Sequence, residues 1–501
     1  MLSISSGRLA CTGNRQLVEE KIASAKAKIE NINTELCGLY QLLNTSSLAA
    51  MLPLEILAEI FLFAAESEFA KRPTSNKLPM PILIGRVCRA WREAAWTTTP
   101  LWKNLVVNLR PSLRGTTSSQ QVVIKEWVQR SGNQPLNIVL KSFPPTRQDQ
   151  EEGCPLEIFQ PLLDVSRRWR RFQTEGWGPG FHALQKKLQE PLHFTLLSEI
   201  SISASDWPPS SPYRWNFRAA PLLVNVEMYD VLPVSFRLDW DRLTSFSGRV
   251  DLAAGFFVMK GASETLKVCS LDLVPPRFPI TSARAITRVH LLENLVSLSI
   301  KLQDNRNEWV DLIPLFQHLE VPELTSLDLT LNGADLRDLL PSLNDLALRS
   351  EFELEHLALV HPDISEHALL AFLATLPSLT HFDLKSDKTR QLFSDLTVSM
   401  LDPASLTDGR SVTECLPCLT RLDYIGFISF SPEKLISMLA NRLKSSTEKS
   451  GGFVDYIDNI NIKYYNKSWA QERDPNVIRE FHRQLDAQNE FFTEVDIIWT
   501  Q

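Results

Sequence analysis

One short motif recurs along most of this chain, a strand-like segment of the form Leu-x-x-apolar-x-apolar. Counting a weaker copy at Leu243, its nine copies begin at spacings of 26, 20, 23, 29, 29, 30, 25 and 40 residues. A single strand of this kind cannot bury its own apolar face, whereas stacked neighbours build a continuous core. The motif therefore constrains this part of the chain to an array of stacked strands. The copies are LSEISI (197–202), LVNVEM (223–228), LTSFSG (243–248), LKVCSL (266–271), LVSLSI (295–300), LTSLDL (324–329), LEHLAL (354–359), LTHFDL (379–384) and LTRLDY (419–424).

Repeats with periods of about 20 to 30 residues and regularly placed leucines are typical of leucine-rich repeats. Helix-like segments fit several of the gaps, at 311–323, 365–378 and 431–443. A similar alternation begins earlier, with strand-like segments at 101–109, 134–141 and 167–174 and helix-like segments at 118–132 and 155–167. We therefore predict an α/β chain in which residues 104–443 form an irregular leucine-rich-like repeat solenoid. An ordinary two-layer α/β domain is the competing interpretation.

Upstream of the repeats, residues 15–46 carry apolar side chains at alternating steps of four and three. Such a heptad predicts a helix with the apolar seam of a coiled coil. Two interpretations are open: the helix docks on the rest of the protein, or it pairs with a partner helix, including self-association through residues 18–43. Residues 1–14 show no such pattern, and we expect them to be disordered. The seam consists of Val18, Ile22, Ala25, Ile29, Ile32, Leu36, Leu39 and Leu43.

The segment MLPLEILAEIFLF (51–63) has helical periodicity but an unusually wide apolar surface. Glu55, Glu59 and Glu66 form one narrow polar stripe, and apolar residues fill most of the remaining circle. A surface helix needs an apolar stripe only about 100° wide. The first helix therefore has a second apolar face that requires a partner, unless it is buried in a large core. We expect a polar loop at 66–80 and then a second helix over ILIGRVCRAWREAAW (82–96).

Beyond the repeats, residues 444–501 are predicted to cap the array. This segment contains the polar loop KSSTEKSGG, a helix that begins near Asp474 and a last strand within FFTEVDIIWT (491–500).

Charge and hydropathy exclude several classes of protein. The formal net charge of −7 argues against nucleic acid as the main partner, because phosphate binding needs a surplus of Lys and Arg. The sequence contains no run of about 18 apolar residues, so we predict no transmembrane helix. The N-terminal segment lacks the apolar core of a secretory signal. We therefore expect an intracellular protein of the cytoplasm or nucleus, without membrane association and with its seven cysteines as reduced thiols.

No catalytic constellation emerges from the sequence, and we expect a protein that is not an enzyme and holds no cofactor or metal. Cys415 and Cys418 form an isolated CxxC that runs into the segment LTRLDY. No helix N-terminus follows to lower a thiol pKa, and no second cysteine pair completes a zinc site. Packing within the array is the expected role, and thiol redox chemistry is the alternative. Glycine-rich phosphate-binding and nucleophile motifs do not occur in the sequence.

Between the buried positions of each repeat strand, alternate side chains point to the opposite face of the sheet. Asp328, Asp383 and Asp423 occupy the same outward position in their repeats. A solvated strand face explains these aspartates, and a ligand that they share is the functional alternative. Together with their neighbours they are also the candidate surface for a protein partner. The candidate substrate-binding surface comprises Ser297, Ser299, Lys301, Asp328, His356, His381, Asp383, Arg421 and Asp423.

The segment 51–102 resembles an F-box. Leu52-Pro53 opens it, Ile56, Leu57 and Ile60 follow, and VCRAW (87–91) with PLW (100–102) closes it. A heptad helix, an F-box at 48–103 and degenerate leucine-rich repeats, in this order, are similar to the large F-box families of mushroom-forming fungi.

This resemblance implies the substrate-recognition subunit of an SCF-type ubiquitin ligase. F-box proteins bind the small adaptor subunit of these ligases, which links them to a cullin, and their repeats present a protein substrate. The alternative is a repeat scaffold that keeps an F-box-like helical region without joining a ligase. Carried over by position, the adaptor contacts are Leu52, Pro53, Ile56, Leu57, Ile60, Val87, Trp91, Leu101 and Trp102.

Overall fold

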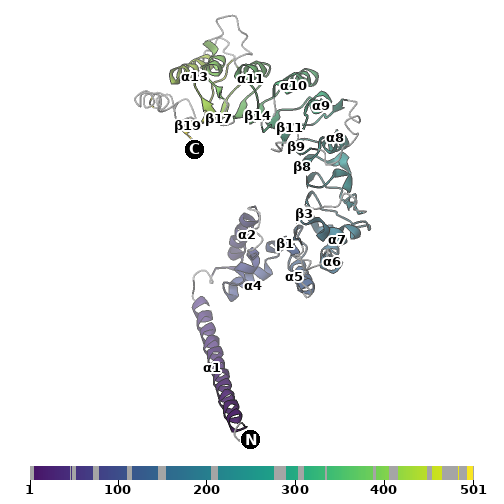
Figure 1. Cartoon of the computed structure of the whole chain (residues 1–501), viewed down its shortest axis with the longest axis vertical. Coiled ribbons are helices and arrows are strands. Elements are labelled where there is room, and N and C mark those ends of the chain that lie inside the picture. Colours follow the sequence, from purple (N-terminus) through teal and green to yellow (C-terminus); the bar gives the residue numbers. More distant parts are fainter. Residues whose placement is uncertain are drawn as a thin grey trace. The chain divides into compact units, whose positions relative to one another are not determined.

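Figure 1 shows the computed structural model of the chain. The chain forms two compact units, residues 1–141 with 155–169 and residues 142–154 with 170–501, and each is described by itself. The model is a mixed α/β structure with an N-terminal helix and a large parallel sheet. The structure describes residues 5–45, 47, 52–70, 78–109, 116–144, 154–204, 213–275, 289–302, 310–332, 336–386, 391–404, 416–447, 454–464, 483 and 494–499.

The first unit begins with α1 (Ser5–Thr45), a long continuous helix (Figure 1). It includes the predicted heptad, but it starts at Ser5, so the expectation of a disordered segment up to residue 14 was wrong for residues 5–14. No proline interrupts the sequence between Ser5 and Thr45, and a helix nucleated by the heptad can propagate into neighbouring residues. The side chains of residues 18–43 all lie exposed.

Four short elements follow and are called the helix cluster: α2 (Leu54–Ala70), α3 (Met80–Ile84), α4 (Arg89–Thr97) and the 3₁₀ helix η2 (Thr99–Trp102). The prediction of a single helix over 82–96 was wrong, because α3 and α4 are two separate helices. The break lies at Gly85, where an added Cβ would stand only 2.0 Å from the ring of Trp96. The Gly85 carbonyl also accepts a 2.7 Å hydrogen bond from Arg92 Nε. Trp96 therefore packs against the backbone of the turn between the two helices.

Tryptophans join the helix cluster to the segment that follows it. Trp102 is 2% exposed, and its ring centroid lies 5.5 Å from that of Trp96 and 4.8 Å from that of Trp127. Trp102 Nε1 donates to the Ala95 carbonyl, and Trp127 Nε1 donates to the Trp102 carbonyl. The Arg130 guanidinium lies over the rings of both Trp96 and Trp102. These contacts explain why the first compact unit extends beyond the boundary predicted at residue 103.

The remainder of the first unit contains the strands and helices predicted after the helix cluster. Alternate side chains of the first strand, Leu105, Val107 and Leu109, are buried, as expected for a strand with one covered face. The elements are β1 (Asn104–Leu109), α5 (Thr116–Arg130), β2 (Leu136–Ser142), α6 (Leu156–Leu163) and η3 (Ser166–Arg168).

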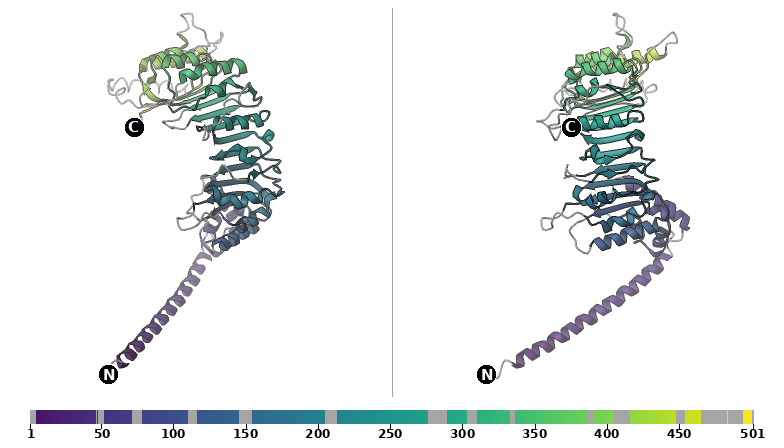
Figure 2. Two further views of the ribbon diagram at one scale, coloured as in Figure 1. Left: turned by 45° about the vertical axis from the view of Figure 1, so that its right-hand side comes forward. Right: turned by 90° about the vertical axis from the view of Figure 1, so that its right-hand side faces the viewer.

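The second unit is built on one parallel sheet whose strands follow chain order (Figure 2). All nine strands predicted from the Leu-x-x-apolar-x-apolar motif are present, and the strand expected near the C-terminus also joins this sheet as β19. β18 was not predicted. The sheet contains β3 (Trp169–Gly176), β4 (Glu199–Ser203), β6 (Asn225–Tyr229), β8 (Ser245–Val250), β9 (Val268–Leu273), β11 (Ser297–Leu302), β13 (Ser326–Thr330), β14 (His356–Val360), β15 (His381–Lys385), β17 (Arg421–Ile428), β18 (Asn459–Tyr464) and β19 (Glu494–Trp499).

Helices return the chain from one strand to the next, and Figure 1 shows them along one side of the sheet. They are α7 (His182–Lys187), α8 (Leu252–Gly261), α9 (Ile313–Gln317), α10 (Leu336–Ser350), α11 (Glu366–Leu373), α12 (Asp395–Leu401) and α13 (Pro432–Thr447), with the 3₁₀ helices η4 (Gly178–Phe181), η5 (Pro233–Ser235) and η6 (Trp240–Arg242). Five short strands lie outside the main strand order. β5 (Trp215–Asn216) pairs with β7 (Phe236–Arg237), and β10 (His290–Leu291) pairs with β12 (Leu319–Glu320), each pair forming a separate two-stranded parallel sheet. β16 (Gln391–Phe393) pairs with β17.

One backbone contact recurs at the entrance to the successive strands of the second unit from β6 to β18. The residue after the first leucine of a repeat offers its carbonyl to two consecutive amides of the next repeat. Thr325 O, for example, accepts from the amides of Glu355 and His356, both at 2.9 Å. The same pair of bonds is made to the carbonyls of Ser198, Val224, Thr244, Lys267, Val296, Thr325, Glu355, Thr380 and Thr420, which we call the entry carbonyls. This contact fixes the register of neighbouring strands.

The register aligns the apolar positions of successive repeats into a core. Leu298 pairs with Leu327, Leu327 with Leu357, and Leu357 with Phe382. All are buried. The first leucine of each repeat is buried as well, at the turn that leads into the strand. The expected loop at 66–80 was wrong for residues 66–70, which continue α2. Residues 71–77 of that loop and the expected helix near Asp474 lie outside the described residues.

A fully buried arginine ties the last helical return to its neighbours. The guanidinium of Arg442, on α13, donates to the carbonyls of Leu401, Leu416, Leu419 and Asp455 at 2.9 to 3.3 Å. A guanidinium has five donors in a fixed plane, so one side chain satisfies several backbone acceptors that are hidden from water. On α10, Arg349 bonds the Phe316 and Leu319 carbonyls in a similar way.

We expect Arg442→Ala to lower the free energy of unfolding by at least about 3 kcal/mol, because each carbonyl left without its donor costs about 1–3 kcal/mol. Urea denaturation of the full chain measures this loss. Lys444→Ala is the matched control, since Lys444 is exposed on the same helix, and should change the free energy by less than about 0.5 kcal/mol. Equal losses in the two variants would contradict a structural role for the buried guanidinium.

Candidate interaction surfaces

α2 presents two different apolar faces. Leu57 and Phe61 are buried within the helix cluster, and the Phe61 ring meets Trp91 edge-on with centroids 5.1 Å apart. Ile56 and Ile60 are each 49% exposed, and Phe63 is 79% exposed. Because successive residues of a helix are rotated by about 100°, these three lie together on a separate face. The helix cluster closes its own core without using this second face.

Other exposed apolar side chains lie on segments next to α2. Leu52 precedes the helix, Leu83 belongs to α3, and Val87 lies in the turn between α3 and α4. Exposed apolar groups on a small folded unit mark surfaces that associate with other molecules. We call Leu52, Ile56, Ile60, Phe63 and Val87 the open apolar residues.

The nine residues carried over as adaptor contacts separate into two groups. Leu52, Pro53, Ile56, Ile60 and Val87 are exposed, and Trp91 is half-buried against Phe61. Leu57, Leu101 and Trp102 are only 1 to 2% exposed, so their side chains do not lie on the surface that the exposed residues form. They fill the core beneath α2 and hold the exposed residues in place.

In the second unit, the nine residues predicted as a substrate surface lie on one face of adjacent strands, β11 to β17. Their strands pair in register, so that equivalent positions form columns across the sheet. One column contains Ser297, Ser326, His356, His381 and Arg421, and the next contains Ser299, Asp328, Ala358, Asp383 and Asp423. Lys301 stands in the third column. We call these side chains the polar strand face.

His356 connects the aspartates of this face. Its Nε2 lies 3.0 Å from Asp383 Oδ2, and its Nδ1 lies 3.4 Å from Asp328 Oδ1. Asp328 and Asp383 sit two strands apart, a separation of about 9 to 10 Å in a sheet. Ala358 occupies the position between them, so the small side chain leaves space for the imidazole to reach both carboxylates. Ser326 Oγ also lies 3.1 Å from His356 Nδ1, a contact that the sequence did not reveal.

The carboxylates change the protonation of this cluster. Its hydrogen bond with Asp383 is the main reason that the pKa of His356 is raised, while partial burial opposes the rise. The same bond lowers the pKa of Asp383. The pKa of Asp328 is raised, mainly because burial disfavours its charged form, although His356 acts in the opposite direction. The arrangement therefore favours a protonated imidazole between two carboxyl groups.

Ser326, His356 and Asp383 include the residue types of a hydrolase triad. His356 Nδ1, the nitrogen that Ser326 Oγ approaches, also lies 3.4 Å from Asp328 Oδ1. A general base must offer a nitrogen lone pair to the hydroxyl that it activates, and this second carboxyl group favours a proton on the same nitrogen. The cluster is suited to hold an ordered pattern of charges for recognition.

Charged side chains also occupy the third column of the face. Arg249 Nε donates to Asp272 Oδ2 over 3.0 Å, and Arg249 Nη1 lies 3.4 Å from Asp230 Oδ2. The hydrogen bond with Asp272 is the main reason that the pKa of Arg249 is raised. Arg249, Asp272 and Asp230 are not among the residues predicted from the sequence. Arg249, Asp272 and Lys301 all stand six residues after the first leucine of their repeats, and this spacing is the signal that could have identified them.

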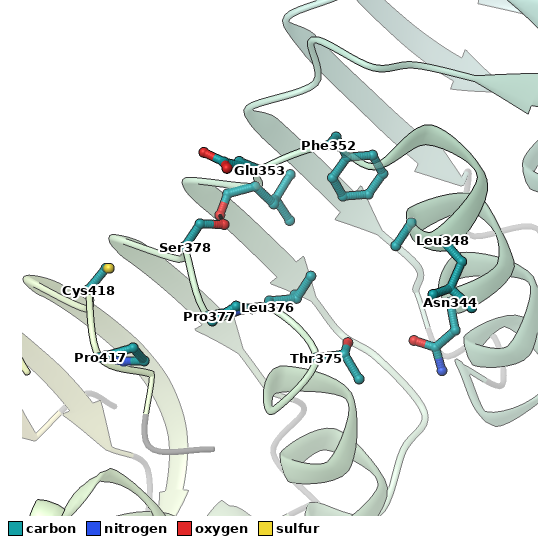
Figure 3. A pocket seen from close by; sticks show the side chains of 12 residues that line it. Asn344, Leu348, Phe352, Glu353, Thr375, Leu376, Pro377, Ser378, Pro417 and Cys418 are labelled. Carbon is teal, nitrogen blue, oxygen red and sulfur yellow. Dashed lines mark hydrogen bonds between the residues drawn. The ribbon is translucent and has the colours of Figure 1, made fainter. Parts of the chain in front are cut away.

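A groove of about 630 Å³ lies beside the entrances to β14, β15 and β17. Figure 3 shows its lining side chains on the end of α10 and on the turns before these strands. Its walls are largely apolar and include Leu348, Phe352 and Leu376. Cys418 lies at one end as a free thiol whose pKa is raised, mainly by burial, which disfavours the reactive thiolate. Cys415, the other half of the CxxC, lies outside the described residues.

Two further properties of the described residues bear on the function. No three His, Cys, Asp or Glu side chains in the described ranges converge in a way that could hold a metal ion. None of the helices within these ranges combines the length and apolar character needed to cross a lipid bilayer.

Comparison with known proteins adds no assignment. No protein-family model matches the chain, and no curated protein matches it.

We expect Asp383→Asn to lower the pKa of His356 towards 6.5, its ordinary value, because the strongest contact that stabilises the imidazolium loses its charge. A pH titration of the His356 ring by NMR measures the change. Asp272→Asn is the matched control on the same sheet face and should leave this pKa unchanged.

The same contact links stability to pH. Because the folded-state pKa of His356 lies above its unfolded value of 6.5, its contribution to stability is present below that pH. The contribution is lost as the pH rises through the folded-state pKa. If Asp383→Asn left the His356 titration unaltered, the charge pattern described for this cluster would be incorrect.

Proposed function

We propose that this protein is the substrate-recognition subunit of an SCF-type ubiquitin ligase. In this proposal the helix cluster is an F-box that docks on the small adaptor subunit of the ligase. The second unit is a leucine-rich-like repeat solenoid that binds a target protein. The observation that carries the proposal is the exposed face of α2, where Ile56, Ile60 and Phe63 stand outside a core that is already closed.

The energetics favour a protein partner on this face. Fully burying an exposed isoleucine or phenylalanine side chain contributes about 1.5–3 kcal/mol, and the half-exposed Ile56 and Ile60 would each contribute about half of this. Several such residues on one short helix therefore provide a substantial part of the free energy of a protein complex. The rigid support from Leu57, Phe61 and Trp102 also limits the entropy lost on docking, since the helix is already held in place.

The second unit supports the other half of the proposal. Its polar strand face presents columns of side chains at the spacing of about 4.8 Å between strands. Fixed by the entry carbonyls, these columns form a rigid array of carboxylates, imidazoles and hydroxyls suited to recognising a folded or extended protein. A receptor of this kind needs no active site, because it accelerates ubiquitin transfer by holding the target near the reacting groups.

Replacing Ile56 and Ile60 together by Asp should abolish co-purification with the small adaptor subunit. Two charges would then face an apolar partner surface without compensation. The measurement is affinity purification of the full chain, together with the recombinant adaptor of a fungal SCF ligase. Val122→Asp with Val123→Asp is the matched control, because both valines are exposed on α5, and it should retain the adaptor. Leu52→Ala with Pro53→Ala should weaken binding by about tenfold or more.

Circular dichroism and thermal melting establish that each variant remains folded. If the wild-type chain never retains the adaptor, or if the Ile56/Ile60 variant retains it fully, the ligase role is rejected. A folded wild-type chain that recovers target proteins without the adaptor would instead support a repeat scaffold that does not join a ligase.

A further inference from the structure

The apolar seam of α1 lies in solvent over its whole described length. Its seven large side chains are between 43 and 67% exposed. From Val18 to Leu43 the seam extends over about 39 Å, at about 1.5 Å per residue. A helix of this kind is stabilised mainly by burying its seam against another helix. The residues beside the seam indicate which helix that is.

The heptad assigns each residue of α1 to a position. Seam residues take positions a and d, and residues at e and g flank them and contact the partner helix. The a positions hold Ile22, Ile29, Leu36 and Leu43, and the d positions hold Val18, Ala25, Ile32 and Leu39. The g positions hold Lys21, Lys28, Glu35 and Leu42, and the e positions hold Glu19, Lys26, Asn33 and Tyr40.

A parallel pair of α1 helices brings like charges together. In that arrangement each g residue faces the e residue of the next heptad in the second copy. Lys21 then faces Lys26 on both sides of the pair, and Glu35 faces the uncharged Tyr40. No g–e pair within residues 18–43 joins opposite charges.

The seam gives no preference for the parallel arrangement either. Parallel dimers favour a β-branched residue at a together with leucine at d, and none of the heptads from Ile22 to Leu39 has this combination. Parallel pairing would also place Ala25 opposite Ala25, which leaves a poorly filled layer between larger residues.

Reversing one helix removes both defects. In an antiparallel pair, a faces d and g faces g of the second copy. Ile22 then packs against Leu39, and Ala25 against Leu36, so small and large residues alternate across the seam. The lysines at g lie in the first half of the helix and the glutamate lies in the second half. Reversal therefore brings Glu35 of each copy beside Lys28 of the other.

We propose that two copies of this chain pair through α1 as an antiparallel coiled coil, with two symmetry-related Lys28–Glu35 ion pairs beside the seam. The occupant of the seam is a second copy, because residues 18–43 are complementary to themselves in both packing and charge. This pairing does not depend on the proposed ligase function, and the two can fail independently.

Charge reversal in the full chain distinguishes the arrangements, with dissociation constants measured by sedimentation equilibrium at low salt. Glu35→Lys turns two attractive pairs into repulsive ones and should weaken the dimer about tenfold. Adding Lys28→Glu restores opposite charges and should return the dissociation constant to within about twofold of wild type. The matched control is Lys26→Glu, which changes nothing at the antiparallel seam because Lys26 faces Asn33 there.

The outcomes separate the possible occupants of the seam. A monomeric wild-type chain would overturn the proposal and leave the seam to another protein. Tighter association of Lys26→Glu, with no effect of Glu35→Lys, would overturn it in favour of a parallel pair. The antiparallel pair is supported if Glu35→Lys weakens dimer association and the added Lys28→Glu restores it. Circular dichroism of each variant shows that α1 stays helical, so that a lost charge contact is not mistaken for a lost helix.

Discussion

A single backbone oxygen at the entrance to each strand from β6 to β18 governs the architecture of the second unit. Each entry carbonyl accepts two consecutive amides from the next repeat, and this leaves no freedom to shift the neighbouring strand by one residue. A shift of that size would exchange the buried and exposed faces of the strand. The leucine before each entry carbonyl is buried at the same turn and holds the oxygen in position. The core and the outward columns both follow from this contact.

On the polar strand face, the register of the strands determines which charged side chains lie next to one another. His356 reaches two aspartates because the strands on either side place Asp328 and Asp383 level with Ala358. With a larger residue in place of Ala358, the imidazole would lose the space through which it approaches both carboxylates. A recognition surface in this fold is therefore specified by the outward residues and by the gaps among them.

Much of this fold was predictable because apolar periodicity is a local property of the sequence. The strand β18 was missed because its motif, Ile457-x-x-Ile460-x-Ile462, begins with isoleucine instead of leucine, although it makes the same paired bonds to Thr420 O. The division of ILIGRVCRAWREAAW into two helices was also missed. It depends on the close contact between Gly85 and the Trp96 ring. Apolar periodicity does not show which glycine is needed because a side chain packs against its backbone. Among the candidate site residues, strand alternation predicted which side chains point outward from the sheet. The burial of Trp102 depends on tertiary packing, so the sequence did not predict it.

The fixed turn before each strand also determines where such a chain can change length over evolution. The spacing of successive repeats varies from 20 to 40 residues, yet every entry carbonyl keeps its two amides. Insertions and deletions that fall between the end of one strand and the turn before the next do not disturb these bonds. Insertions inside the turn would separate the leucine from its oxygen. The segments between strands can therefore change in length while the register of the sheet stays the same.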